Sequence, residues 1–131
     1  METAIIVLLC LCLMPYLMAC VSGYYRQKQL GKVDNQNPRE QYTQLQGAGA
    51  RAVAAQQNSW EALAIYSAAL LSVAASGVVV EHLALAAIIV LVARLFHAAF
   101  YLANIDKLRT LAFAIALAPS LYLFYMSISY L

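Results

Sequence analysis

The feature that most constrains this chain is the grouping of its apolar residues into four long blocks separated by polar links. Each block has about the 20 residues that an α-helix needs to cross about 30 Å of hydrocarbon. Long unbroken apolar runs lack the alternation that marks the strands of a transmembrane barrel. We therefore predict an all-α membrane protein, a single four-helix bundle over residues 1–131, with spans near residues 4–22, 58–80, 83–103 and 108–130.

Composition excludes several other classes of protein. Apolar residues make up 64% of the chain and charged residues 11%, whereas a soluble domain is roughly half apolar and about a quarter charged. A soluble globular domain and a disordered chain therefore do not fit. The net charge of +2 gives no reason to expect nucleic acid as a partner.

The three cysteines all lie in the first apolar block, at Cys10, Cys12 and Cys20. Neither their number nor their setting indicates a disulfide framework or a zinc site, so we interpret them as small apolar residues of a helix. An alternative is a lipid anchor at Cys20, because residues 17–20 resemble a lipoprotein cleavage site. A signal peptide begins with basic residues, however, and this chain has Glu2 instead, which favours an uncleaved first span.

Basic residues fall on alternate links. The first link, residues 23–57, contains five basic residues and the third contains Lys107 and Arg109, whereas the second, near residues 76–82, contains none. Links one and three share one side of the membrane, which the positive-inside rule makes the cytoplasmic side. We therefore expect both termini to be non-cytoplasmic.

The first link contains a signal for a helix start. Asn37 can cap the helix, Pro38 suits its first position, and Glu40 is placed to reach back to the amide of the capping residue. No residue between there and Gly77 forbids a helix, and Gly47 and Gly49 are positions where it can bend. We therefore expect the second transmembrane helix to be able to extend below the membrane by several turns.

The spans contain polar residues at helical spacing, which is unusual because ionisable groups in a membrane are costly and tend to be functional. Spacings of three, four and seven place each set on one helix face. The two stripes are Arg51, Asn58 and Glu61 on the second helix and Arg94, His97 and Tyr101 on the third.

Each polar residue also has a structural interpretation. Glu61 and Arg94 can pair to join two helices, His97 can form a single interhelical hydrogen bond, and Tyr101 and Arg109 can anchor the membrane interface. Taken together, the stripes favour a shared site for a small anionic ligand with carboxylates, since arginine binds carboxylates in a bidentate manner. An arginine beside a thiol also stabilises the reactive thiolate.

Two segments and two short motifs resemble the MAPEG family, the membrane-associated proteins in eicosanoid and glutathione metabolism. Residues 51–61, RAVAAQQNSWE, resemble the helix-two signature, and residues 94–101, RLFHAAFY, resemble the helix-three motif. Arg109-Thr110 resembles the basic start of helix four, and residues 37–40 are similar to the segment before helix two in bacterial members. The combination is more specific than any one motif.

The resemblance implies a homotrimer of four-helix subunits that binds glutathione between neighbouring subunits near the cytoplasmic side. It implies that Asn58 and Glu61 hold the polar groups of glutathione and that Arg94, His97 and Tyr101 line the same pocket. Arg109 would stabilise the thiolate, and Tyr101 or Thr110 would assist as a hydrogen-bond donor. Arg51 matches a family arginine, but Ala54 stands where eukaryotic members carry another, which leaves open whether glutathione is the thiol used.

We therefore predict a bacterial inner-membrane protein that binds glutathione, with transferase or peroxidase activity toward a small apolar electrophile. The rival hypothesis is a non-catalytic scaffold or a small transporter subunit, in which the pair of Glu61 and Arg94 is structural. A third is a cation-coupled exporter that uses Glu61. It is disfavoured because Glu61 lies near the edge of its span.

Overall fold

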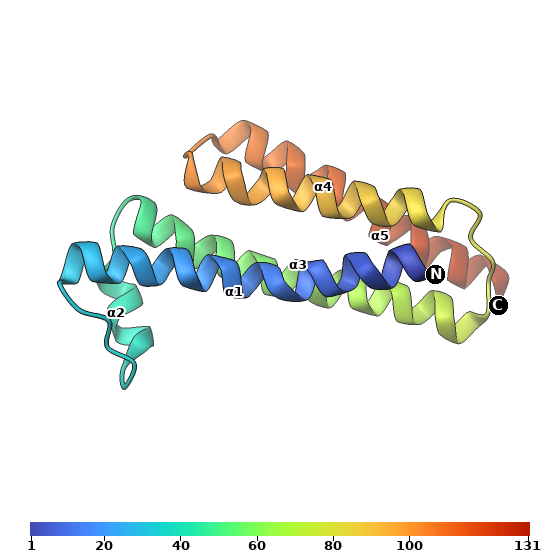
Figure 1. The fold of residues 1–131 in the computed structure, drawn as a ribbon. Helices are drawn as coiled ribbons and strands as arrows, with labels where there is room; N and C mark the ends of the chain where they lie inside the picture. Colours follow the sequence, from blue (N-terminus) through green and yellow to red (C-terminus); the bar gives the residue numbers. More distant parts are fainter.

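The computed structural model describes all residues 1–131, and every regular element in it is a helix (Figure 1). The all-α prediction is therefore confirmed. Four of the helices are long and apolar enough to cross a membrane, and the second is a short helix in the first link. The elements are α1 (Glu2–Leu30), α2 (Pro38–Gln44), α3 (Ala48–Ser76), α4 (Leu83–Leu102) and α5 (Asp106–Tyr130).

The long helices form two antiparallel pairs. α1 lies against α3 and α4 lies against α5, and the pairs meet where α3 touches α5 and where α1 touches α4. Both termini lie at one end of the bundle, and α2 and the turn between α4 and α5 lie at the other (Figure 1). The two basic links therefore share one end, as the charge pattern predicted.

Small residues allow the helices to approach closely. Ala4, Ala55, Ala69 and Ala87 are completely buried, as expected where membrane helices pack through small side chains. Tyr66 is also completely buried, and its hydroxyl donates a hydrogen bond of 3.2 Å to the carbonyl oxygen of Ala4. This bond joins α3 to the start of α1.

Glycines in the left-handed conformation end two of the long helices. Gly31, with φ 76°, follows α1, and Gly77, with φ 72°, follows α3. Glycine adopts this conformation without the steric cost of a Cβ atom. As a result, α1 ends eight residues after the predicted span of 4–22. α3 ends four residues before the end of the predicted span of 58–80.

The first link begins its helix where the sequence predicted, but the expected cap is not formed. α2 starts at Pro38, yet neither Asn37 nor Glu40 forms a capping hydrogen bond. Instead, Asp34 Oδ1 accepts hydrogen bonds from the backbone amides of Gln36 at 2.8 Å and Asn37 at 3.2 Å. These bonds hold the pKa of Asp34 below its ordinary value, because they stabilise the carboxylate form.

The second long helix extends below its predicted span, as expected, because α3 begins at Ala48, ten residues before residue 58. It is not continuous with the helix of the link. α2 ends at Gln44, Leu45 is extended, and Gly47 has φ 54°, so the chain turns before α3 begins at Ala48. The link is fixed against α1 by Arg26, which is buried with Gln41. The guanidinium of Arg26 donates to the carbonyl oxygen of Asp34 at 3.2 Å and to Gln41 Oε1 at 3.3 Å.

Candidate functional site

The centre of the candidate site is a hydrogen-bond relay from α4 to α3. Arg94 Nη1 donates to Asn58 Oδ1 at 2.8 Å, and Asn58 Nδ2 donates to Glu61 Oε2 at 3.3 Å. The direct pair of Glu61 and Arg94 that the sequence suggested is therefore replaced by a bridge through Asn58. An asparagine amide can form this bridge because it carries both an acceptor and a donor.

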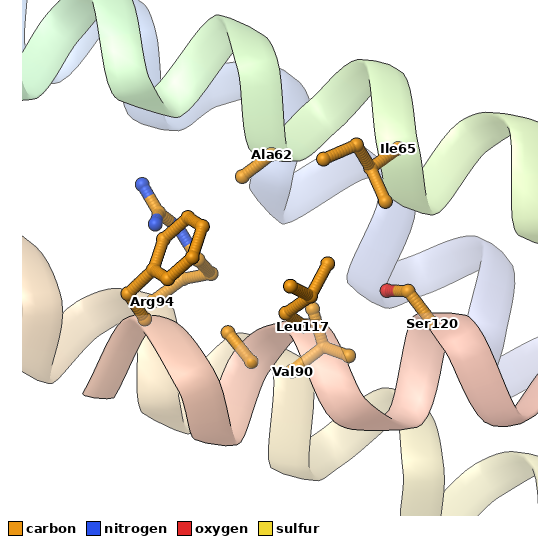
Figure 2. A pocket seen from close by; sticks show the side chains of 8 residues that line it. Ala62, Ile65, Val90, Arg94, Leu117 and Ser120 are labelled. Carbon is orange, nitrogen blue, oxygen red and sulfur yellow. The ribbon is translucent and has the colours of Figure 1, made fainter. Parts of the chain in front are cut away.

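Arg94 lies deep in the bundle, with 1% of its surface exposed. Its Nε and Nη2 atoms are buried and have no hydrogen-bond partner. Its side chain borders a narrow cavity of about 20 Å³ enclosed by α3, α4 and α5, which is room for about one water molecule. Figure 2 shows Arg94 and Ser120 at opposite ends of this cavity, with apolar side chains between them.

A second group of side chains joins the end of α4 to the start of α5. The rings of His97 and Tyr101 meet edge to face with their centres 5.5 Å apart, and the guanidinium of Arg109 lies 4.6 Å from the centre of the Tyr101 ring. His97 is buried, and its Nδ1 atom has no partner. On its other side His97 faces Phe113, at 6.4 Å between ring centres.

Two of the predicted site residues are hydrogen-bonded elsewhere. Arg51 Nε donates to the carbonyl oxygen of Leu102 at 3.3 Å, at the C-terminal end of α4, where a cation is favoured by the helix dipole. The Thr110 hydroxyl donates to the carbonyl oxygen of Asp106 within α5. In this protomer, neither residue contacts the relay.

The structure thus brings together six of the eight predicted residues in two adjoining groups. The relay contains Asn58, Glu61 and Arg94, and the ring group contains His97, Tyr101 and Arg109. All six lie in the halves of α3, α4 and α5 nearest the basic links, because these helices run antiparallel.

Sequence reasoning did not identify the residues of α5 behind the site. Phe113 faces His97, and Ser120 is buried at the far end of the cavity beside Arg94. The spacing of four between Arg109 and Phe113, which places them on one helix face, could have suggested Phe113. Ser120 could have been noticed as a polar residue in an apolar span.

The comparisons with known proteins agree with this architecture. The model of the MAPEG family matches residues 3–129, which is nearly the whole chain. No curated protein and no solved structure shows significant similarity to it. Four candidate membrane helices and this match over their full length show a multi-pass membrane protein of a glutathione-related class. The chain therefore belongs to the MAPEG family.

Proposed function

We propose that this protein binds glutathione at the cluster formed by the relay and the ring group, and that the bound thiolate attacks a small apolar electrophile from the bilayer. The Glu61 carboxylate gives the proposal its main support. Its side chain is exposed, Oε2 is oriented by Asn58, and Oε1 accepts no hydrogen bond within the chain. An oriented carboxylate with a free oxygen is suited to an ammonium group.

Glutathione offers groups that match the rest of the cluster. It has an ammonium group, two carboxylates and a thiol, and the cluster offers the Glu61 carboxylate and the guanidinium of Arg109. Arg109 is half-buried and bonded to no carboxylate, so it remains available to an anion. A guanidinium beside the sulfur favours the thiolate, which is the nucleophilic form.

The proposed reaction is conjugation. The thiol releases its proton to solvent, and the thiolate sulfur forms a bond to an electrophilic carbon. The electron pair displaced from that carbon moves to the leaving or accepting group, to which the Tyr101 hydroxyl can donate a hydrogen bond. Peroxide reduction by the bound thiol is the related activity that the same arrangement supports.

A homotrimer is part of the proposal, with the site between subunits. In the single protomer Glu61 is exposed and Asn58 and Tyr101 are half-exposed, so the cluster opens outward. A neighbouring copy would supply the missing wall and exclude water, which strengthens electrostatic interactions. The basic links at the same end of the bundle support a cytoplasmic location for this site.

Calorimetry on the purified full-length protein tests the proposal. We expect millimolar glutathione to bind the wild-type protein, and Glu61→Gln to weaken binding about ten-fold, because one charge-assisted hydrogen bond is weakened. Glu81→Gln is the matched control, since Glu81 is exposed on the opposite link. Absence of binding to the folded wild-type protein, or equal losses in both variants, would favour the non-catalytic scaffold or transporter subunit.

A further inference from the structure

Two residues of the ring group are joined by a short turn. Tyr101 lies one residue before the end of α4, and Arg109 is the fourth residue of α5. Three residues, 103–105, connect the two helices, and we call them the α4–α5 corner. Arg109 is bonded to no carboxylate, so its position over the Tyr101 ring depends on how this corner is folded.

The corner is a tight turn in which an asparagine adopts the left-handed conformation. The amide of Asn104 donates to the carbonyl oxygen of Tyr101 at 3.2 Å, and the amide of Ile105 donates to that of Phe100 at 2.9 Å. These are the two hydrogen bonds of a Schellman motif, in which a left-handed residue follows the helix. Asn104 has φ 61°, and it is the only non-glycine residue of the chain with a positive φ. Because this conformation has a steric cost that glycine avoids, a contact from outside the corner is needed to offset it.

Arg51 supplies such a contact from α3. The carbonyl oxygens of Phe100 and Tyr101 are paired within the motif, whereas that of Leu102, the last residue of α4, has no backbone partner. The Nε atom of Arg51 donates to this oxygen at 3.3 Å, where the helix dipole favours a cation. No other residue outside α4 and α5 forms a hydrogen bond with Leu102 or with the corner.

The start of α3, which carries Arg51, is itself packed against α1. Gly49 lies so close to α1 that a Cβ atom there would be 3.0 Å from the Cβ atom of Tyr25. Just before it, Gln46 exchanges two hydrogen bonds with the side chain of Gln29 on α1, of 3.0 and 3.1 Å. Arg51 therefore connects the corner to a closely packed part of the bundle.

We propose that Arg51 is a positioning residue, which holds the α4–α5 corner so that Arg109 faces the sulfur of the bound thiol. This role rests on the proposed function, and it gives Arg51 an effect through the corner instead of a contact with the ligand. Two consequences can be measured separately. Arg51 orders the corner with or without a ligand, and the ordered corner increases the thiolate fraction of bound glutathione.

Two substitutions separate the hydrogen bond of Arg51 from its charge. In Arg51→Gln, the amide nitrogen occupies the same place along the side chain as Nε of arginine, so a donor is kept and the charge is lost. Arg51→Met has a similar length and lacks both. In the ligand-free protein, we expect Arg51→Met to lower the hydrogen-exchange protection of the Ile105 and Arg109 amides several-fold and Arg51→Gln to keep most of it. Full protection in Arg51→Met, or equal losses in both variants, would overturn the proposal.

Bound glutathione reports the second consequence. The ultraviolet absorbance of the thiolate measures its fraction at neutral pH, and S-methylglutathione, which has no ionisable thiol, measures binding of the rest of the tripeptide. We expect Arg51→Met to lower the thiolate fraction several-fold with an unchanged affinity for S-methylglutathione, and Arg51→Gln to resemble the wild type in both. Equal losses of affinity for S-methylglutathione in the two variants would show that Arg51 is a direct ligand and contradict the positioning role. An unchanged thiolate fraction in Arg51→Met would contradict it as well.

Lys107→Gln is the matched control for charge. Lys107 is exposed in the first turn of α5, two residues before Arg109. The substitution removes a positive charge beside the same corner, so exchange protection and thiolate fraction should both stay close to wild type. A fall in the thiolate fraction equal to that in Arg51→Met would mean that the net charge of this end of the bundle controls the thiol, which would refute the proposal.

Asn104 tests the same corner without any change to Arg51. Asn104→Gly should keep the exchange protection and the thiolate fraction, because glycine adopts a positive φ without steric cost. Asn104→Val should lower both, since a β-branched residue is strained in this conformation. A wild-type thiolate fraction in Asn104→Val would mean that the corner does not position Arg109. Failure of the wild-type protein to bind glutathione and S-methylglutathione would contradict the proposed function alone, because the exchange measurements test Arg51 without a ligand.

Discussion

The guanidinium of Arg109 lies over the ring of Tyr101, 4.6 Å from its centre, so the first turn of α5 is oriented by a side chain of α4. A cation–π contact of this kind contributes about 0.5–1 kcal/mol at an exposed site. The ring thus positions Arg109 independently of the Tyr101 hydroxyl. The two roles of Tyr101 can therefore be separated by substitution.

We predict that Tyr101→Phe keeps the affinity for glutathione within about two-fold, because the ring and its contact with Arg109 remain. Tyr101→Leu should weaken binding by a few-fold, in line with the loss of about 0.5–1 kcal/mol. Both variants should slow conjugation of an aryl halide, since both lack the hydroxyl. Calorimetry and a conjugation assay measure the two effects, and wild-type conjugation by Tyr101→Phe would exclude the hydroxyl from the reaction.

The relay predicts that a double variant, Asn58→Ala with Arg94→Leu, is more stable than the single variant Asn58→Ala. Asn58→Ala should destabilise the protein by about 1–3 kcal/mol, because it leaves the buried guanidinium of Arg94 without its one hydrogen-bond partner. Adding Arg94→Leu to this variant should recover part of the loss, because the unpaired charge is removed. Unfolding in mixed micelles measures the free energy of unfolding of each variant. Gln57→Ala is the control, since Gln57 is exposed. Additive losses in the double variant would contradict the argument.

Close helix packing predicts a difference between neighbouring alanines of α3. Ala69 is completely buried and Ala68 is exposed. Ala69→Leu should lower the free energy of unfolding by about 1–3 kcal/mol, as overpacking does in well-packed cores. Ala68→Leu should change it by less than about 0.5 kcal/mol. The same unfolding measurement checks both, and similar effects at the two positions would argue against close packing around Ala69.

Much of the fold could be predicted from the sequence because membrane helices depend on the length and continuity of apolar residues. The two polar stripes could be predicted too, since positions three or four apart share a helix face. The bridge through Asn58 could not. Asn58 and Glu61 lie one turn apart on the same face, and spacing alone does not decide which of them reaches Arg94.

The first link shows the same limit more clearly. Arg26 and Lys28 are two cations in one polar segment, yet Arg26 is buried against Gln41 whereas Lys28 is exposed. The difference depends on how residues 31–47 fold back on α1, which local patterns do not encode. The missing cap of α2 has the same origin, because Asp34 accepts the hydrogen bond from the Asn37 amide that Glu40 was expected to accept.

The stability of the turn formed by Asp34 should depend on pH. The pKa of Asp34 is lowered from its ordinary value of 3.8, so the carboxylate stabilises the folded link above that pH, and the stabilisation is lost as the pH falls through the lower folded pKa. Hydrogen exchange of residues 35–37 should therefore show protection that decreases below about pH 4, after correction for the intrinsic exchange rate. Asp34→Asn should reduce the protection at neutral pH and remove its pH dependence. Glu40→Gln is the control, because Glu40 does not cap the turn. Protection that declines equally in wild type and Asp34→Asn would show that another group controls the link.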